Sequence, residues 1–555
     1  MGGARAGQQG VNNHRERTAR NVGKIWDSSL TGAKPGDYGR NNSEAAGFDA
    51  VRSQDSTSGS YFRRPQSSIL GVVMRKALLG LSLCSIILLG ISLARCGGTN
   101  TVTVGNPLPV SAMVPVSLTV GDDPPTGVAV IRFQVQITNA TLQPTDTTQA
   151  PVSMLVGPMN VELLHLQTET APLGDINVPA GSYSSLTASF ANPQMTIFNN
   201  TNQTLTLGTQ SCAANQFCVF NPPLNQSSAT VRAPTAPFPV TLSANSPLGF
   251  EMHFDVNASV QGDLTISPKI TLKQVVPATA TTPIGQFHIV GRVTSVISPS
   301  FIIQVGFGGL TAPVTTNSST QYNFPTCATD NFSCLVDGQV VEVGVNLIPG
   351  GTLTAVTVRL LEQQNLPSLQ GVIVHVNAAQ NQFDMVLMDL QETFASVNPG
   401  LLITVQTNSS MPFSVDSDGV TVPAGLTFTN SASLVAGQTV EIHPLATPFV
   451  APGPTALPLI NVSTDSVTLE SSQVAGIVGT VNPSGTPPSF TLLSLSPVLA
   501  HSSISLIDVD VLTGTVFVDV TGLGGVKAGD KVFVGGLLFN TTGAPTLVAE
   551  RVRDN

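Results

Sequence analysis

Charged and aromatic residues are scarce in this sequence. Of its 555 residues, 10% are Asp, Glu, Lys or Arg and 5% are aromatic, with a single Trp and four Tyr. A coiled coil or helical bundle draws about half of its residues from Ala, Glu, Lys, Leu and Arg, so this composition, with 50 Gly and 40 Pro, excludes both. A wholly disordered chain is excluded too, because 41% of the residues are hydrophobic and many of these are Val, Ile and Leu.

Basic residues are concentrated near the start of the chain. Residues 1–95 carry 13 Lys and Arg against 6 Asp and Glu, whereas residues 96–555 carry 10 against 27. A body with so few cations cannot neutralise many phosphates, which excludes nucleic acid as a partner. A length of 555 residues is sufficient for three or four domains.

An export signal is predicted at residues 74–95. Three residues, Met74, Arg75 and Lys76, form a short basic segment, and residues 77–93 form an uncharged apolar run. Small residues and a cysteine follow. This order of basic, apolar and small residues is the layout of a cleavable export signal.

The end of this signal, Leu93-Ala94-Arg95-Cys96-Gly97, resembles the lipobox of bacterial lipoproteins. The resemblance implies that the signal is removed, that Cys96 becomes the lipidated first residue, and that the mature protein rests on a membrane. Arg95 stands where that family has Gly, Ala or Ser. Two alternatives therefore stay open. One is an uncleaved anchor, with a 17-residue run at the short limit for a span and its basic flank in the cytoplasm, and the other is export without lipidation.

The segment before the signal, residues 1–73, is polar and rich in Gly, Ser, Asn and Arg. Export signals stand at the true N-terminus. Either translation begins at Met74, or the segment is a disordered cytoplasmic tail ahead of an anchor.

Four cysteines lie beyond Cys96, as two local pairs. Cys212 and Cys218 form one pair, and Cys327 and Cys334 form the other. Short loops of this kind close as disulfides in an oxidising compartment, which agrees with export. A zinc site is the less favoured alternative, because neither pair has the usual metal-ligand spacing.

The body of the chain reads as β-strands. Residues 131–138 alternate strictly between apolar and polar, which predicts a strand with one face on a core. After a Pro/Ala/Thr-rich linker the chain repeats. Each unit opens with Gly-x-Val, has a Phe in its second strand and later carries a Gly-Gln or Gly-Asp turn into a Val-rich strand. The openings begin at Gly291, Gly371 and Gly476, the aromatics are Phe301, Phe383 and Phe490, and the turns are at Gly338, Gly437 and Gly529.

These units resemble an uncharacterised small β-barrel repeat family of bacterial envelope proteins. The segment before them resembles an N-terminal β-sandwich family of bacterial lipoproteins. Both are domains of unknown function, so the resemblance implies architecture and compartment only. The expected fold is all-β, with a β-sandwich followed by three small β-barrel or sandwich repeats. The expected segments are 1–73 (disordered or mis-called start), 74–95 (signal), 96–108 (tether), 109–275 (sandwich), 276–285 (linker), and the repeats 286–363, 369–470 and 474–555.

No catalytic arrangement or cofactor motif is present in the sequence. Seven His are scattered without metal-ligand spacing, and no nucleophile elbow or phosphate-binding loop occurs. Asp416 and Asp418 lie in an Asp-x-Asp-Gly segment that matches the start of a calcium loop. The loop lacks its terminal bidentate Glu, and a plain hairpin turn is the favoured interpretation. Asp508 and Asp510 share one face of a strand, which is expected to be solvated.

The favoured function is therefore a lipid-anchored, extracytoplasmic protein of the cell envelope with a binding, adhesion or structural role. Modules in series would project from the membrane, and the partner would be a polysaccharide or an envelope protein. No enzymatic activity is expected. Two alternatives stay open: an extracytoplasmic hydrolase whose site is assembled from distant residues, and a scaffold subunit of an envelope complex. The outer membrane, the periplasm and the cell surface all fit the location.

Overall fold

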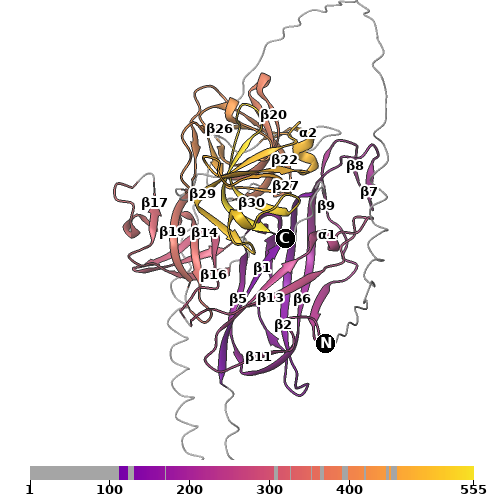
Figure 1. The fold of residues 1–555 in the computed structure, drawn as a ribbon, viewed down its shortest axis with the longest axis vertical. Coiled ribbons are helices and arrows are strands. Elements are labelled where there is room, and N and C mark those ends of the chain that lie inside the picture. Colours follow the sequence, from indigo (N-terminus) through magenta and orange to yellow (C-terminus); the bar gives the residue numbers. More distant parts are fainter. Residues whose placement is uncertain are drawn as a thin grey trace, which may run out of the picture. The chain divides into compact units, whose positions relative to one another are not determined.

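A computed structural model gives the fold of one compact unit, Val104–Asn555 (Figure 1). The predicted signal 74–95, Cys96 and the tether 96–108 lie outside the described residues. Within the described residues, no helix is long and apolar enough to cross a membrane. The described residues are 112–122, 130–168, 170–279, 281–305, 310–324, 327–351, 353–362, 368–390, 398–417, 420–444, 449–451 and 459–554.

The first module is a β-sandwich of two sheets. One sheet has the strand order β13-β12-β1-β5, and the other has β10-β6-β2-β3, with β4, β9 and β11 pairing beside it. Its elements are β1 (Met113–Asp122), β2 (Val130–Pro144), β3 (Val152–Ser153), β4 (Met159–Glu162), η1 (Leu164–Leu166), β5 (Ala171–Pro179), β6 (Gly181–Phe198), β7 (Leu205–Leu207), β8 (Gln210–Cys212), β9 (Phe217–Phe220), β10 (Ser228–Arg232), β11 (Val240–Leu242), β12 (Leu248–Phe254), α1 (Val256–Ser259) and β13 (Ile270–Val275).

The alternating segment at 131–138 forms the first half of β2. Phe133, Val135 and Ile137 are fully buried in the core between the sheets. Period-two alternation puts the intervening residues on the other face. The strand thus follows directly from the pattern.

The next three modules are barrels of five principal strands, and the first two of them carry one and two further short strands. Barrel 1 contains β14 (Gly285–Ile297), β15 (Ser300–Val305), β16 (Leu310–Thr315), β17 (Gln321–Asn323), η2 (Phe332–Cys334), β18 (Val340–Leu347) and β19 (Leu353–Glu362). Barrel 2 contains β20 (Leu369–Asn377), η3 (Ala378–Gln380), β21 (Gln382–Leu390), β22 (Leu402–Gln406), β23 (Phe413–Val415), η4 (Ser431–Ser433), β24 (Thr439–Pro444), β25 (Phe449–Ala451) and β26 (Leu459–Glu470). Barrel 3 contains β27 (Ser472–Asn482), β28 (Ser489–Leu493), α2 (Pro497–His501), β29 (Ile507–Val518), η5 (Leu523–Gly525), β30 (Lys531–Phe539) and β31 (Thr546–Asp554).

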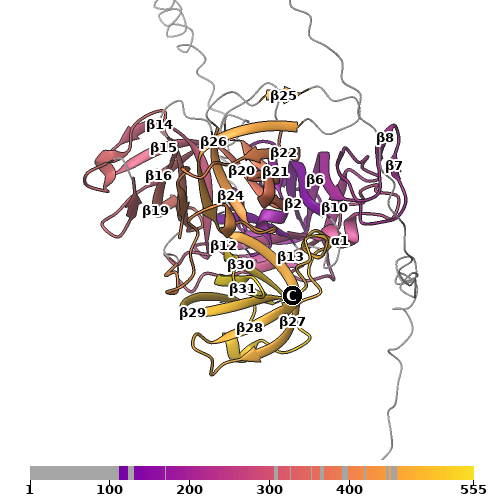
Figure 2. The ribbon, with the colours of Figure 1, turned by 90° about the horizontal axis from the view of Figure 1, so that it is seen from above.

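All three barrels share one topology. Barrel 3 is closed in the order β27-β28-β29-β31-β30, and its strands lie together in Figure 2. The first two barrels follow the same order and close through β16–β19 and β22–β26. In each barrel two of the principal strands pair in parallel. These pairs are β16 with β19, β22 with β26, and β29 with β31. This arrangement is the five-stranded Greek-key barrel of the OB-fold.

The repeated Phe has one structural role. Phe301, Phe383 and Phe490 each lie at the second residue of the second strand and are at most 1% exposed. Each contributes a large ring to the core of its own barrel. The sequence repeat therefore marks a repeated core position.

The repeated Gly-Gln or Gly-Asp turn has a backbone reason. Gly338, Gly437 and Gly529 have φ of 91°, 93° and 93°, a region that favours glycine. In each barrel the side chain of the next residue accepts a hydrogen bond from a backbone N–H three residues earlier. These bonds are Val336 N to Gln339 Oε1, 2.8 Å, Val435 N to Gln438 Oε1, 2.7 Å, and Lys527 N to Asp530 Oδ2, 2.7 Å.

The sequence alone suggested modules that stand apart in series. In the structure they pack on one another. Phe198 of the sandwich, Val386 and Met388 of barrel 2, and Val498 of barrel 3 belong to one buried apolar cluster. The core of barrel 2 also includes Leu537 of barrel 3. Apolar surface shared in this way couples neighbouring modules.

Candidate functional site

The predicted cysteine pairs lie at disulfide distance. Cys212 on β8 is bonded to Cys218 on β9, with Cα atoms 5.7 Å apart. Cys327 is bonded to Cys334 of η2, with Cα atoms 5.9 Å apart. Each disulfide closes a short loop within its own module, the first in the sandwich and the second in barrel 1, as the sequence suggests.

The calcium-loop candidate has a different environment from the one that a metal site requires. Asp416 directly follows β23, and its carboxylate forms an ion pair with Arg359 of barrel 1. Asp418 lies outside the described residues. Among the residues that the structure describes, no group of three or more His, Cys, Asp and Glu could hold a metal ion.

Arg359 is the centre of an ionic cluster between barrels 1 and 2. From β19 it donates to Glu342 Oε2 on β18 at 2.9 Å from Nε and 2.6 Å from Nη2. Its Nη2 also donates to Glu470 Oε2 at the end of β26, at 3.1 Å. With Asp416, one guanidinium thus contacts three carboxylates from both barrels.

Burial and like charge perturb this cluster. Burial raises the pKa of Glu470 to about 8, and the neighbouring Glu441 and Glu342 add to that rise, while Arg359 opposes it. Burial alone would lower the pKa of Arg359, but the surrounding carboxylates raise it above its ordinary value. Glu441 has a buried Oε1 without a hydrogen bond, 3.8 Å from Nε2 of His443. The cluster therefore holds more carboxylates than its single arginine neutralises.

A second buried arginine joins the sandwich to barrel 2. Arg132 on β2 is 1% exposed, and its Nε donates to the carbonyl oxygen of Met388 at 3.3 Å. Its guanidinium also donates to Gln194 Oε1 at 2.9 Å and to Gln134. Beside it, the hydroxyl of Thr196 donates to the carbonyl oxygen of Gly400 at 2.9 Å.

A third buried arginine joins barrel 3 to the sandwich. Nη1 of Arg553 donates to the carbonyl oxygens of Asp122 and Gln167, each at 2.8 Å. Nη2 of the same residue lies 3.5 Å from Nδ1 of His253, whose Nε2 is 3.0 Å from Glu251. Burial would raise the pKa of Glu251, but His253, Lys273 and Arg553 hold it below its ordinary value.

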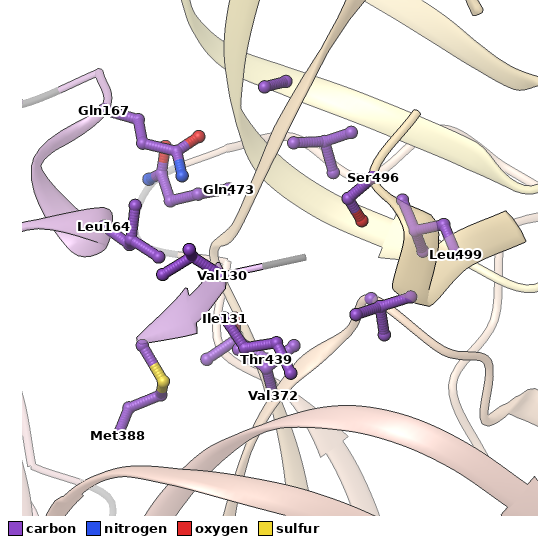
Figure 3. A pocket seen from close by; sticks show the side chains of 14 residues that line it. Val130, Ile131, Leu164, Gln167, Val372, Met388, Thr439, Gln473, Ser496 and Leu499 are labelled. Atoms are coloured by element: carbon purple, nitrogen blue, oxygen red, sulfur yellow. The ribbon is translucent and has the colours of Figure 1, made fainter. Parts of the chain in front are cut away.

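A cavity of about 100 Å³ lies where the sandwich, barrel 2 and barrel 3 meet (Figure 3). Its walls are mainly apolar, and none of its lining residues is charged. The lining residues are Val130, Ile131, Leu164, Gln167, Val372, Met388, Gly437, Thr439, Gln473, Val474, Ala475, Ser496, Val498 and Leu499.

A few polar groups interrupt these walls. Figure 3 shows the amides of Gln167 and Gln473 close together on one side and Ser496 on the other. Oε1 of Gln167 is buried and makes no hydrogen bond. Oε1 of Gln473 accepts from the Thr168 hydroxyl at 2.9 Å. An apolar pocket with a few convergent polar groups is the usual form of a small-molecule site.

Sequence reasoning did not find the three arginines or the cavity. Arg132 alternates with Phe133 on β2, so the pattern assigns it to the face away from the sandwich core. It is buried because barrel 2 covers that face. The only sequence signal is the scarcity of basic residues, which makes each one in the body notable. Asp508 and Asp510 do lie on one face of β29 as predicted, and burial together with Asp508 raises the pKa of Asp510.

Comparisons with known proteins find two domains of unknown function. Residues 113–273 match a family described as Domain of unknown function (DUF4382). Residues 290–359 match one described as Domain of unknown function (DUF5666). The chain thus contains two domains similar to uncharacterised families, one over the sandwich and one over barrel 1.

Matches to individual proteins add little. No curated protein matches the chain. Four chains of solved structures match, among them one entitled drosophila Unr CSD456. It is 10% identical with a TM-score of 0.11, and the match covers 48% of this chain and 97% of that chain.

Proposed function

We propose that this is an exported, lipid-anchored protein of the bacterial cell envelope with a binding or structural role. The observation that carries the proposal is the pair of disulfides, since such bridges persist in oxidising, extracytoplasmic compartments. The signal layout at 74–95 and the lipobox-like ending at Cys96 support it independently. An envelope polysaccharide or an envelope protein is the proposed partner.

The junctions between modules support a binding or structural role. Arg132 and Arg553 hold backbone carbonyls of neighbouring modules, and an apolar cluster spans three modules. Such contacts keep the outer faces of the modules in a fixed relation. A preorganised surface binds a partner with less loss of conformational entropy than a flexible string of domains.

Lipidation at Cys96 is the first test. In cells fed a palmitate analogue, the protein should carry the label and fractionate with membranes. Cys96→Ser should abolish the label and release the protein. Cys84→Ser, inside the apolar run, is the matched control and should leave the label in place. Label that survives Cys96→Ser would refute the anchor.

The binding role is tested by incubating residues 97–555 with cell-wall polysaccharides and with solubilised membrane proteins. Saturable, reversible retention of a polysaccharide or of a membrane protein supports the binding role, whereas a stoichiometric protein complex that survives purification supports the alternative of a scaffold subunit. Turnover in a panel of hydrolase substrates would favour an extracytoplasmic hydrolase over both.

A further inference from the structure

The β10-β6-β2-β3 sheet of the sandwich meets barrel 2 at one end of its outer face. There Arg132 of β2 and its cross-strand neighbour Thr196 of β6 donate to the carbonyl oxygens of Met388 and Gly400 in barrel 2. Strands β2 and β6 stay paired beyond this end, with β10 beside β6 (Figure 2). The open part of the face is therefore continuous with a polar interface that the molecule already uses.

A row of hydroxyl groups crosses the open part of this face. Ser153, Thr141, Thr187 and Thr230 are successive cross-strand neighbours on β3, β2, β6 and β10. The three threonines alternate along their strands with side chains that are buried in the sandwich core, which puts the hydroxyls on the outer face. The Oγ1 atoms of Thr187 and Thr230 are 2.8 Å apart, and the bond between them uses only one of the two hydroxyl hydrogens.

Polar side chains flank this row on both sides, and all of them are exposed or half-buried. They are Asn139, Ser189 and Ser228 in one row and Gln143, Ser185 and Arg232 in the other. We refer to the three rows together as the hydroxyl face. It contains no carboxylate, no aromatic ring and a single cation. The sequence has the same property over a long stretch, because residues 176–231 include no Asp, Glu, Lys, Arg or His.

This composition distinguishes between classes of partner. The centre of a protein interface is enriched in aromatic residues, Met and Arg and depleted of Ser, which is the opposite of the hydroxyl face. An anionic polymer would find only Arg232 to neutralise it, and a cationic polymer would find no carboxylate. A neutral polysaccharide is complementary. Its hydroxyls donate and accept hydrogen bonds as those of Ser and Thr do, and it brings no charge that must lose its hydration.

We propose that the hydroxyl face binds a chain of a neutral polysaccharide. This inference rests on the proposed function and takes the polysaccharide, not the envelope protein, as the partner. The hydroxyls are held on paired strands, and the Thr side chain is restricted about χ1, so binding costs little conformational entropy. Because the face has no aromatic ring for a sugar to stack on, hydrogen bonds supply the affinity. Each contributes about two- to tenfold, so several rows must act together.

The combined variant Thr141→Val, Thr187→Val and Thr230→Val tests this site. Val removes the hydroxyl, keeps the branched shape and favours strands. The full chain is run in native gels that contain dextran, hydroxyethyl cellulose or galactomannan, and retardation of the band measures the affinity. The substitutions leave the net charge unchanged, so mobility without polysaccharide should be the same. At least one neutral polymer should retard the wild type more than anionic polygalacturonate does, and the triple variant should lose about tenfold or more in affinity.

A second triple variant is the matched control. Thr206→Val, Thr271→Val and Thr513→Val make the same change at exposed threonines of β7, β13 and β29, and should keep the wild-type retardation. Thermal unfolding checks that both triple variants are folded. Equal retardation of the two would overturn the assignment of the site and leave a polysaccharide-binding role in place. Retardation by none of the neutral polymers, or by polygalacturonate alone, would overturn the neutral polysaccharide as the partner. Incubation with solubilised membrane proteins and labelling at Cys96 test the proposed function separately.

Discussion

Three arginines of the body, Arg132, Arg359 and Arg553, are placed at junctions between modules. Residues 96–555 contain only ten basic residues, so this is a large share of them. The planar guanidinium with its five N–H donors suits such sites, because it can satisfy several carbonyls and carboxylates from different modules at once. The polar contacts that join the modules therefore depend on a few individual residues.

The ionic cluster around Arg359 predicts a dependence of stability on pH. The pKa of Glu470 is raised from 4.5 to about 8 in the folded protein. The contribution of a group whose folded pKa is raised is complete below its unfolded pKa and is lost as the pH rises through the folded pKa. We expect the contact between barrels 1 and 2 to weaken from about pH 4.5 to pH 8.

Glu470→Gln tests this dependence, because Gln stays neutral over the whole range. The loss of thermal stability between pH 5 and pH 8 should be smaller in this variant than in the wild type. Asp519→Asn, which removes a surface carboxylate paired with Lys273, is the matched control and should keep the wild-type slope. An unchanged slope in Glu470→Gln would show that the charge of Glu470 does not govern the contact.

Removal of Arg359 should be strongly destabilising. Its side chain is 12% exposed and faces three carboxylates, and loss of one partner from a buried ionic group costs about 3–5 kcal/mol. We expect Arg359→Met to lower the free energy of unfolding by that amount in urea titrations. Lys273→Met breaks an ion pair whose side chains are 51% and 44% exposed, and should change it by less than about 1 kcal/mol. An equal change in the free energy of unfolding in both variants would argue against a structural role of the ionic cluster around Arg359.

At the scale of elements, the repeated glycine turn allows the same substitution to be compared in barrels 2 and 3. Gly437 and Gly529 both have φ of 93°. A Cβ at Gly437 would lie 2.7 Å from Leu499 Cδ2 of barrel 3, whereas nothing lies within 4 Å at Gly529. Gly529→Ala should cost about 1–2 kcal/mol from backbone conformation alone. Gly437→Ala should cost more, because Leu499 must also move, and urea unfolding of both variants would measure the difference.

The disulfides are predicted to act locally. Each closes a loop with a sequence separation of 6 or 7 residues, for which chain entropy gives on the order of 2–3 kcal/mol. The turns of barrels 2 and 3 that correspond to Cys334 have no cysteine and keep the same shape. Reduction should raise hydrogen exchange at β8, β9 and η2 while the circular dichroism spectrum stays that of a folded β-protein. Titration of the denatured, unreduced exported protein should find none of the four thiols free.

Much of each module could be predicted from local patterns. Alternation at 131–138 identifies β2, and the spaced Phe and Gly residues identify equivalent positions in three barrels. The apolar segment 161–166 also has the composition of a strand, but β4 ends at Glu162 and the 3-10 helix η1 follows at Leu164–Leu166. A short apolar run cannot distinguish these outcomes, because both bury the same side chains.

Contacts between modules could not be predicted in the same way. The alternating pattern assigns Arg132 to the face of β2 that points away from the sandwich core. It carries no information on barrel 2, which covers that face. Gln167 and Gln473 are more than 300 residues apart and meet only because the sandwich and barrel 3 pack together. A pattern read along the chain carries no signal for contacts between residues so far apart, and the candidate site depends on such contacts.

At the scale of the whole molecule, barrels 2 and 3 should behave as one cooperative unit. Leu537 of β30 is 1% exposed and belongs to the core cluster of barrel 2. Nε2 of Gln438 in barrel 2 also donates to the carbonyl oxygen of Leu538 at 2.9 Å. Barrel 3 therefore supplies part of the hydrophobic core of barrel 2. Loss of these side chains should destabilise both barrels.

A pair of Leu→Ala substitutions separates this coupling from ordinary loss of core packing. Leu537→Ala and Leu492→Ala each remove a fully packed side chain and should each cost about 2–5 kcal/mol. Leu492 is fully buried within the core cluster of barrel 3. Hydrogen exchange should therefore rise in β28 and β29 for Leu492→Ala, but in β24 and β26 of barrel 2 as well for Leu537→Ala. If hydrogen exchange in barrel 2 is the same in both variants, the two barrels fold as independent domains.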